Sequence, residues 1–398
     1  MRKLIVHQLT PSQYDRVRPI FQGMDHNLAV QAILDGSVPA DIYVDDPTLP
    51  RVALASNKQR HYLAGSPLNQ GFNEHLRHRL AGATSSRQNE SGDGLFILYY
   101  APADAWEETL DTLLQDMNPI RFDREYYAIQ TTRDESHPSS TQLPEGFSRR
   151  YVDRDLLAQE DLGNLDDLIE ELCSERQSVQ DFLDRSFGFC LLHGDEVAGW
   201  CLSEYNTLGR CEVGIATFEP HRRRGLATSM AFALIDLARS HGISQMGWHC
   251  YASNAASAAT ARKAGFVKTV EYPVRFAYLD ETINLAVHGS VAFQQEQYDQ
   301  ALARYQEAFL RGGAPTWAYW NAACASALVG QRATALLYLE QALDRGFDDL
   351  ERLLASEHLT SLHDMEEWKA LTRRLEDHGA REGDAQTGQA VLKNCLPC

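Results

Sequence analysis

Positive charge and long apolar runs are the two things that this sequence has little of. The 398 residues include 37 Lys and Arg against 55 Asp and Glu, which gives a formal net charge of -18. A surface this acidic repels a phosphate backbone, so we expect no nucleic-acid partner. No apolar run reaches the roughly 18 residues that a membrane span needs, and residues 1–8 are too polar for a signal peptide. We therefore expect a cytoplasmic globular protein without membrane contact.

Cysteine is also sparse, with eight residues in the chain. Four of them lie in apolar, strand-like runs, where we expect them to be reduced packing residues: Cys190, Cys201, Cys211 and Cys250. The terminal Cys395-Leu396-Pro397-Cys398 resembles a prenylation box or a redox pair only superficially, and we interpret it as part of a tail without function.

Two kinds of catalytic signature are missing. His241, His249 and Cys250 do not form a set at metal-ligand spacing, so we predict no metal site, and we expect His249 to be a core or cleft histidine. No Gly-x-Ser-x-Gly segment is present either, which argues against a serine hydrolase of that type.

Composition divides the chain into five segments. We expect an α/β domain over 1–130, a linker rich in Ser, Thr and Pro over 131–146, and a second α/β domain over 147–280. Helical repeats follow over 281–378, and a flexible tail over 379–398 ends the chain.

Hydrophobic periodicity places the elements within these segments. In the first domain we expect strands at 42–44, 52–55, 95–100 and 126–129, and helices at 72–80 and 104–114. In the second domain we expect three antiparallel strands at 187–192, 197–202 and 211–217, a helix from 226 to near 242, a strand at 246–251, a helix at 255–264 and a strand-rich end through 278.

The third segment repeats itself. Ala301, Leu302, Tyr305 and Ala308 recur 34 residues later as Ala335, Leu336, Leu339 and Ala342, which is the tetratricopeptide period. About two repeats and a terminal helical cap fit the length. Because so short an array leaves an open face, we expect it to dock on the preceding domain.

The segment 222–227, Arg-Arg-Arg-Gly-Leu-Ala, leaves a strand-like run and opens a helical one. At such a junction backbone N–H groups and the positive helix end point at one locus, which binds anions. Gly225 lets a phosphate approach the backbone, and the arginines add charge to an otherwise acidic chain. An arginine-rich turn before an ordinary helix would show the same six residues. The residues around the segment must therefore distinguish a phosphate-binding loop from such a turn.

Glu212 precedes this loop by ten positions. Because side chains alternate along a strand, Glu212, Gly214 and Ala216 share one face, and the two small residues leave room beside the carboxylate. We expect desolvation between Cys211 and Val213 to raise the pKa of Glu212 toward that of a general base. A solvated or salt-bridged strand carboxylate is the alternative.

Further motifs follow the loop in a definite order: the strand 248–250, then Asn254, Ser257 and the segment Lys263-Ala264-Gly265-Phe266. This order, over 187–278, resembles that of the GNAT superfamily of N-acetyltransferases. The resemblance implies an acyltransferase that uses acetyl-CoA as co-substrate. It also implies an α/β fold of tandem GNAT-like mixed sheets, with a degenerate first half and a cofactor-binding second half, before the all-α tetratricopeptide-like region.

The resemblance assigns roles to individual residues. The backbone of Ile215, Ala216 and Thr217 would pair with the pantetheine amides where two strands separate. The pyrophosphate would bind at Arg222, Arg223, Arg224, Gly225, Leu226, Ala227 and Thr228. Asn254 and Ser257 would line the other side of the cofactor, and Glu212 would deprotonate the amine directly or through water.

One position departs from the family pattern. The family commonly has a Tyr, the acid for the leaving thiolate, where this chain has Ala261. Tyr251 and Cys250 are candidate replacements at the end of the preceding strand, although such residues are more often packing residues. We assign Tyr251 to the catalytic set, and water is the alternative proton donor.

Within the superfamily, the strand 248–250, the Asn254–Ser257 spacing and the segments 42–47 and 124–127 resemble the zwittermicin A resistance-type acetyltransferases. In that group the N-terminal half is a degenerate GNAT fold without a phosphate loop. No Arg-x-x-Gly-x-Gly/Ala segment precedes residue 131, which agrees.

The acceptor is less defined by the sequence. The acidic run 166–171 and Glu204 favour a cationic acceptor, although a solvated helix face also explains the run. Our first hypothesis is N-acetylation of a small cationic metabolite or an amine antibiotic. The second is acetylation of a protein or peptide amine delivered by the helical repeats, and the third is an acyl-CoA-binding sensor or scaffold without catalysis.

Overall fold

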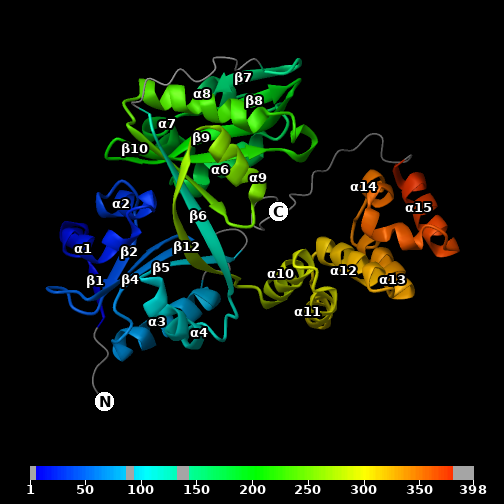
Figure 1. Cartoon of the computed structure of the whole chain (residues 1–398), viewed down its shortest axis with the longest axis horizontal. Helices are drawn as coiled ribbons and strands as arrows, with labels where there is room; N and C mark the ends of the chain where they lie inside the picture. Colours follow the sequence, from blue (N-terminus) through cyan, green and yellow to red (C-terminus); the bar gives the residue numbers. More distant parts are fainter. Residues whose placement is uncertain (1–5, 87–93, 132–142, 380–398) are drawn as a thin grey trace.

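The computed structural model describes residues 6–86, 94–131 and 143–379. Its strands form one mixed sheet of 12 strands (Figure 1). In spatial order these are β1 (His7–Leu9), β2 (Asp41–Val44), β3 (Val52–Asn57), β4 (Arg60–Gly65), β5 (Leu95–Ala101), β12 (Val267–Tyr278), β6 (Ile120–Gln130), β11 (Gln245–Tyr251), β10 (Arg210–Thr217), β9 (Glu196–Thr207), β8 (Gly188–His193) and β7 (Phe147–Tyr151).

The two halves of the chain exchange their last strands. β12, which ends the second half, pairs antiparallel with β5 and β6. β6, which ends the first half, pairs antiparallel with β11. The expectation of two separate sheets is therefore wrong: long-range pairing, which local periodicity does not encode, joins the halves into one sheet.

Helices cover both faces of the sheet in each half. The first half carries α1 (Arg18–Phe21), α2 (Leu28–Leu34), α3 (Gln70–Ser86) and α4 (Ala103–Leu113), and the second carries α5 (Arg154–Leu157), α6 (Leu165–Glu175), α7 (Val179–Arg185), α8 (Leu226–Ser240) and α9 (Ala255–Lys263). α3 and α4 share a core with β3 and β5, while α2 packs on the opposite face. α8 and α9 cover one face of the second half, and α6 and α7 cover the other.

The order of elements expected in the second half is confirmed, including the antiparallel run β8–β9–β10. Three strands were missed: β1, β4 and β7. β7 is an edge strand whose side chains are almost all exposed, so it has no apolar alternation to detect. β4 begins with Arg60 and His61, although His61 is buried in the structure.

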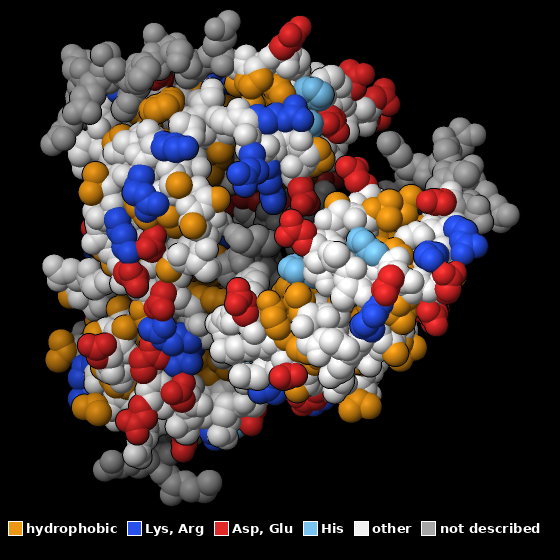
Figure 2. Space-filling view, turned by 45° about the vertical axis from the view of Figure 1, so that its right-hand side comes forward, with side chains coloured by type: hydrophobic (Ala, Val, Ile, Leu, Met, Phe, Trp, Pro, Cys, Tyr) orange, Lys and Arg blue, Asp and Glu red, His pale blue; other side chains and the backbone are white. Residues whose placement is uncertain are grey.

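The C-terminal region is helical, as expected. It consists of α10 (Glu281–Gln294), α11 (Tyr298–Arg311), α12 (Thr316–Leu328), α13 (Arg332–Leu343), α14 (Leu350–Ala355) and α15 (Glu366–Gly379). The four repeated positions are buried on α11 and again on α13. Figure 2 shows this region as a lobe beside the sheet.

The lobe docks through α10, which contacts β12 of the preceding domain, as expected, and also the first half of the chain. Asn284 Nδ2 donates hydrogen bonds to the carbonyl oxygens of Met117 and Asn118, at 3.1 and 3.2 Å. Val287 joins the core that α2 shares with the sheet. The exchange of β12 into the first half explains this placement, because α10 follows β12 directly along the chain.

Cys190, Cys201, Cys211 and Cys250 are buried and free, as predicted. Most of the predicted linker and the tail from 380 on, with its two cysteines, lie outside the described residues. Within the part of the chain that the structure describes, no helix has the length and hydropathy to cross a membrane.

Candidate active site

The predicted phosphate loop joins β10 to α8. Gly225 adopts a left-handed conformation, with φ +79°, immediately before α8, and a side chain at this position would meet no protein atom within 4 Å. No side chain caps the N-terminus of α8, so its first N–H groups are available to an anion. The three arginines of the loop, Arg222, Arg223 and Arg224, are exposed. Figure 2 shows basic side chains on the surface of the second half, which carries this loop.

The arginines are not equivalent. Arg222 Nε donates a hydrogen bond of 3.0 Å to the carbonyl oxygen of Thr217, which folds the loop back on the end of β10. The Arg224 guanidinium lies 5.9 Å from the ring centroid of Phe147. Arg223 has a positive φ of 62°, so two of the four residues before α8 are left-handed, a conformation that aims successive backbone N–H groups at one point.

β10 and β11 separate beside this loop. The parallel pairing covers only Arg210 to Glu212 on β10, whereas β10 continues to Thr217 and keeps pairing with β9. A register shift between Arg210 and Glu212 marks the point of separation. From Val213 onward the edge of β10 that faces β11 has no strand partner, so its peptide groups are free to bind a ligand.

Glu212 lies where the two strands separate. Its carboxylate is 6% exposed, and Oε1 accepts hydrogen bonds from the backbone N–H of Leu28 at 2.6 Å and from His249 Nε2 at 3.1 Å. Leu28 is the first residue of α2, so the carboxylate caps a helix of the first half.

The pKa expected for Glu212 was wrong in direction. Burial does raise it, but His249, the Leu28 hydrogen bond and Arg124 outweigh burial and lower the pKa of Glu212 below its ordinary value. The neighbours Cys211 and Val213, on which the expectation was based, point to the other face of the strand. Groups from β11, β6 and α2 set the ionisation instead.

His249 and Tyr272 extend the polar cluster around Glu212. His249 Nδ1 lies 2.8 Å from the Tyr272 hydroxyl, and in a neutral imidazole whose Nε2 donates to Glu212, Nδ1 accepts a hydrogen bond from this hydroxyl. Burial raises the pKa of Tyr272 well above its ordinary value, so the hydroxyl keeps its proton. Sequence reasoning expected His249 to be a core or cleft histidine and assigned no role to Tyr272, because β12 reaches β6 only through the strand exchange.

Asn254 and Ser257 are both engaged at the N-terminus of α9. Asn254 Oδ1 accepts a hydrogen bond from the Ser257 N–H at 2.9 Å, and Ser257 Oγ accepts one from Trp248 Nε1 at 3.0 Å. Their side chains therefore shape this helix end, and their contact with a cofactor stays a prediction.

Tyr251 shares the strand face of His249, two residues further along β11. Its ring packs edge-on against Phe122 with a centroid distance of 5.4 Å and lies 5.1 Å from the Arg124 guanidinium. Ala261 is fully buried in the core under α9. Tyr251 thus lies against Phe122 and Arg124 of β6, and its role as an acid stays a prediction.

A small cavity beside Glu212 contains three more carboxyl groups. It is lined by Glu171, Leu172, Glu175, Arg176, Phe182, Ser186, Leu202, Ser203 and Glu204. Glu204 pairs with Glu212 across β9 and β10. A side chain at Gly214 would lie 1.9 Å from Glu204 Oε1, so the room that we expected beside Glu212 is filled by the Glu204 carboxylate.

The charge in this cavity is only partly balanced. Arg60 of the first half binds Glu175 at 2.6 Å. Among the described residues neither Glu171 nor Glu204 forms an ion pair. Burial, and then repulsion by neighbouring carboxylates, raise the pKa of Glu204 and of Glu171 above their ordinary values. The acidic run 166–171 therefore splits: its last residue lines the cavity, whereas Asp166 is on the solvated face.

Comparisons with known proteins agree with this geometry. The family model described as GNAT acetyltransferase matches residues 18–275. The uncharacterized N-acetyltransferase YdfB of Bacillus subtilis (strain 168) is 28% identical over 275 residues, which cover 69% of this chain and 99% of that protein.

Two solved structures are similar to this chain, and the first of them shows its fold. The GCN5-related N-acetyltransferase-like protein from Streptococcus suis 89/1591 matches with a TM-score of 0.52 and 24% identity, over 67% of this chain and 98% of its own. The GCN5-related N-acetyltransferase from Sphaerobacter thermophilus matches at 14% identity with a TM-score of 0.48, over 69% of this chain and 95% of that one.

The family match ends at residue 275, before the helical lobe begins. It includes the separating strands, the phosphate loop and Glu212, and it covers well over half of the chain. The chain therefore belongs to the GNAT acetyltransferase family and is an acyltransferase.

Proposed function

We propose that this protein transfers the acetyl group of acetyl-CoA to a primary amine of a small cationic metabolite or an antibiotic-like compound. The arrangement at Glu212 carries the proposal. The pairing of β10 with β11 ends there, a buried carboxylate occupies the junction, and the uncapped start of α8 follows. Direct acyl transfer needs these parts: a groove, a base and an anion site.

The cofactor lies along the free edge of β10 in this proposal. The peptide groups of Ile215, Ala216 and Thr217 that face away from β9 bind the pantetheine amides, because the pairing of β10 with β11 ends at Glu212. The backbone of Arg222–Thr228 binds the pyrophosphate at the N-terminus of α8. The N-terminus of α9, held by Asn254 and Ser257, lines the opposite side.

Glu212 is the proposed base. Its lowered pKa keeps it ionised at neutral pH, so it can accept the proton of the attacking amine directly or through water. The amine nitrogen forms a bond to the thioester carbonyl carbon, and the bond from that carbon to sulfur breaks. The leaving thiolate takes up a proton, for which Tyr251 is the proposed donor.

The cavity lined by Glu171, Glu175 and Glu204 is the proposed acceptor subsite. Two of its carboxyl groups have no cationic partner among the described residues, and a substrate with a second positive charge would supply one.

Thiol release from acetyl-CoA tests the catalytic role, with a panel of polyamines, amino sugars and peptides. We expect Glu212→Gln to lower kcat by about 10²-fold or more, since general bases contribute about that much. Gln retains an oxygen that accepts the Leu28 and His249 hydrogen bonds, so acetyl-CoA affinity should stay unchanged. Tight acetyl-CoA binding with transfer to none of the amines would contradict the proposal and favour a sensor.

A matched pair of glycine variants tests the cofactor site. Gly225 and Gly242 flank the two ends of α8, both with positive φ (79° and 74°) and with no protein atom within 4 Å of an added side chain. Replacing either by Ala imposes a similar backbone strain of about 1–2 kcal/mol. Only Gly225→Ala should weaken acetyl-CoA binding, measured by calorimetry. If both variants bind acetyl-CoA with equal affinity, the pyrophosphate does not bind at this loop.

Acetylation of a protein amine is the second candidate. The helical lobe favours it, because α11 and α13 repeat with the tetratricopeptide period and lie beyond the family match. Turnover of peptides in the same assay, with small amines inert, would support this candidate over the first.

A further inference from the structure

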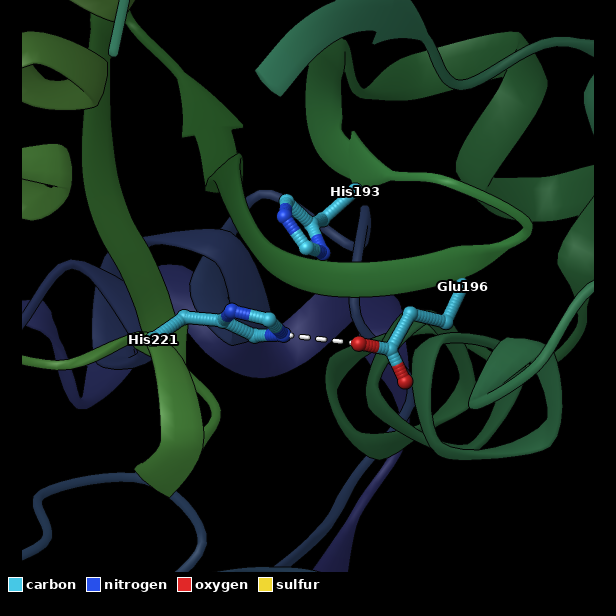
Figure 3. A group of neighbouring side chains, drawn as sticks. All are labelled: His193, Glu196 and His221. Atoms are coloured by element: carbon cyan, nitrogen blue, oxygen red, sulfur yellow. Dashed lines mark hydrogen bonds and ion pairs between the residues drawn. The ribbon is translucent and has the colours of Figure 1, made fainter. Parts of the chain in front are cut away.

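Three side chains with metal-binding atoms meet just before the phosphate loop (Figure 3). His193 ends β8, Glu196 begins β9, and His221 is the last residue of a short 3-10 helix over Glu219–His221. One ligand atom from each lies within 4.8 Å of the other two. His221 Nε2 is 2.8 Å from Glu196 Oε1, and the two imidazole centroids are 5.0 Å apart.

The surroundings hold these groups while leaving one side open. His221 is 5% exposed, and its Nδ1 has no hydrogen-bond partner in the described part of the chain. Phe147 packs against both imidazoles, with centroid distances of 4.7 and 5.5 Å. The Glu196 side chain is 44% exposed, so an ion has a path from solvent.

We propose that His193, Glu196 and His221 bind a Zn²⁺ ion, with water in the fourth position. Two imidazoles and one carboxylate are the donors that zinc prefers, whereas Mg²⁺ and Ca²⁺ prefer oxygen alone. Tetrahedral zinc bonds of about 2.0–2.2 Å place ligand atoms roughly 3.3–3.6 Å apart. Small side-chain rotations bring the three groups from their present spacing to that geometry.

The ion would connect two segments that no disulfide joins among the described residues. His193 and Glu196 flank the β8–β9 turn, and His221 directly precedes Arg222. Zinc therefore fixes the first residue of the phosphate loop against the hairpin, and it should tighten acetyl-CoA binding. That consequence rests on the proposed function of the loop, whereas zinc binding itself does not.

The sequence contains a second zinc-binding candidate, Cys395 and Cys398, which lies outside the described residues. The two sources differ spectroscopically. Tetrahedral Co²⁺ gives visible d–d bands with either ligand set, but only thiolates add a sulfur-to-metal charge-transfer band. Cobalt thus reports which residues hold the ion.

The test uses the full chain after dialysis against EDTA. Zn²⁺ is titrated by calorimetry and Co²⁺ by absorption, with Cys395→Ser/Cys398→Ser as the background. We expect one ion per chain, d–d bands without charge transfer, and an affinity at least tenfold weaker in His193→Ala and in Glu196→Gln. His78→Ala, an exposed histidine elsewhere, should bind as the parent does.

Failure of the variants to fold is checked separately, by comparing their thermal unfolding with that of the parent in EDTA. His193 and Glu196 are only half-buried or exposed, so in EDTA we expect the variants and the parent to unfold at the same midpoint temperature. Added zinc should raise this midpoint only in the parent. Affinity unchanged in both variants, or no binding in the Cys395→Ser/Cys398→Ser background, would overturn the proposal. Either result would leave the acetyl-transfer assays unaffected.

Discussion

Replacement of Glu204 by Gln should make the protein more stable and a poorer binder of cationic amines. The carboxyl group lies against Gly214, next to two further carboxyl groups in the cavity, and it forms no ion pair with the described residues. Gln has nearly the same shape and removes only the charge. Stability and binding therefore change in opposite directions if the cavity holds an ionised carboxylate.

The magnitude follows from the raised pKa. Burial and the neighbouring carboxylates raise the pKa of Glu204 above its ordinary 4.5, so the folded protein holds this proton more tightly than the unfolded chain does. The stabilisation that this tighter proton binding gives is present in full below about pH 4.5, and it is lost as the pH rises through the pKa of Glu204 in the folded protein. A difference of one pKa unit corresponds to about 1.4 kcal/mol. We expect Glu204→Gln to add at least about 1 kcal/mol at about pH 8 and nothing at about pH 4.

Thermal unfolding at both pH values measures this effect, which should raise the midpoint by roughly 2 °C at the higher pH. Steady-state kinetics on the same variant should show KM for a polyamine about tenfold higher, the equivalent of about 1.4 kcal/mol. Glu170→Gln, on the exposed side of α6, is the control. A variant that is less stable at about pH 8, or that binds the polyamine as the parent does, would refute the reasoning.

Further outcomes follow from other groups. Burial lowers the pKa of His26 to about 4 from 6.5, so stability falls as pH drops between these values, and His26→Gln should recover roughly 1–2 kcal/mol of that loss in acid unfolding. Because the pKa of Glu212 is lowered, kcat/KM should show no loss of the base between about pH 7 and 5. Gly289→Ala would place a methyl group 2.6 Å from Tyr305, and unfolding of the helical lobe should become easier by roughly 1–3 kcal/mol with transfer unchanged.

The sequence predicts the local parts of the site well. The sequence predicts a junction between a strand and a helix at 222–227, and Gly225 there takes a left-handed conformation that glycine adopts more readily than other residues. The order of strands and helices from β8 to β12 follows from periodicity, because each of these elements has a buried side that repeats along it, as the exposed edge strand β7 does not.

Features that depend on distant pairing could not be predicted this way. The ionisation of Glu212 depends on Leu28, 184 positions away along the chain, and on His249, which a strand neighbour brings into reach. His193 and Glu196 are close in sequence, but their third partner, His221, comes from another segment and carries no spacing that marks a metal site.

The contact between Glu212 and α2 also suits the role that we propose for the first half of the chain. The first half has no phosphate loop, yet its helix N-terminus donates a hydrogen bond to the proposed base, and its Arg60 binds a carboxylate in the acceptor cavity. Both interactions favour the ionised form of the carboxylate that they touch: the pKa of Glu212 is lowered, whereas burial still raises the pKa of Glu175 and Arg60 offsets part of that rise. The exchange of β6 and β12 fixes the two halves in one sheet, and thereby fixes these contacts. In the proposed mechanism the first half is thus a wall of the site whose groups favour the ionised form of these carboxylates, and the family match spans both halves.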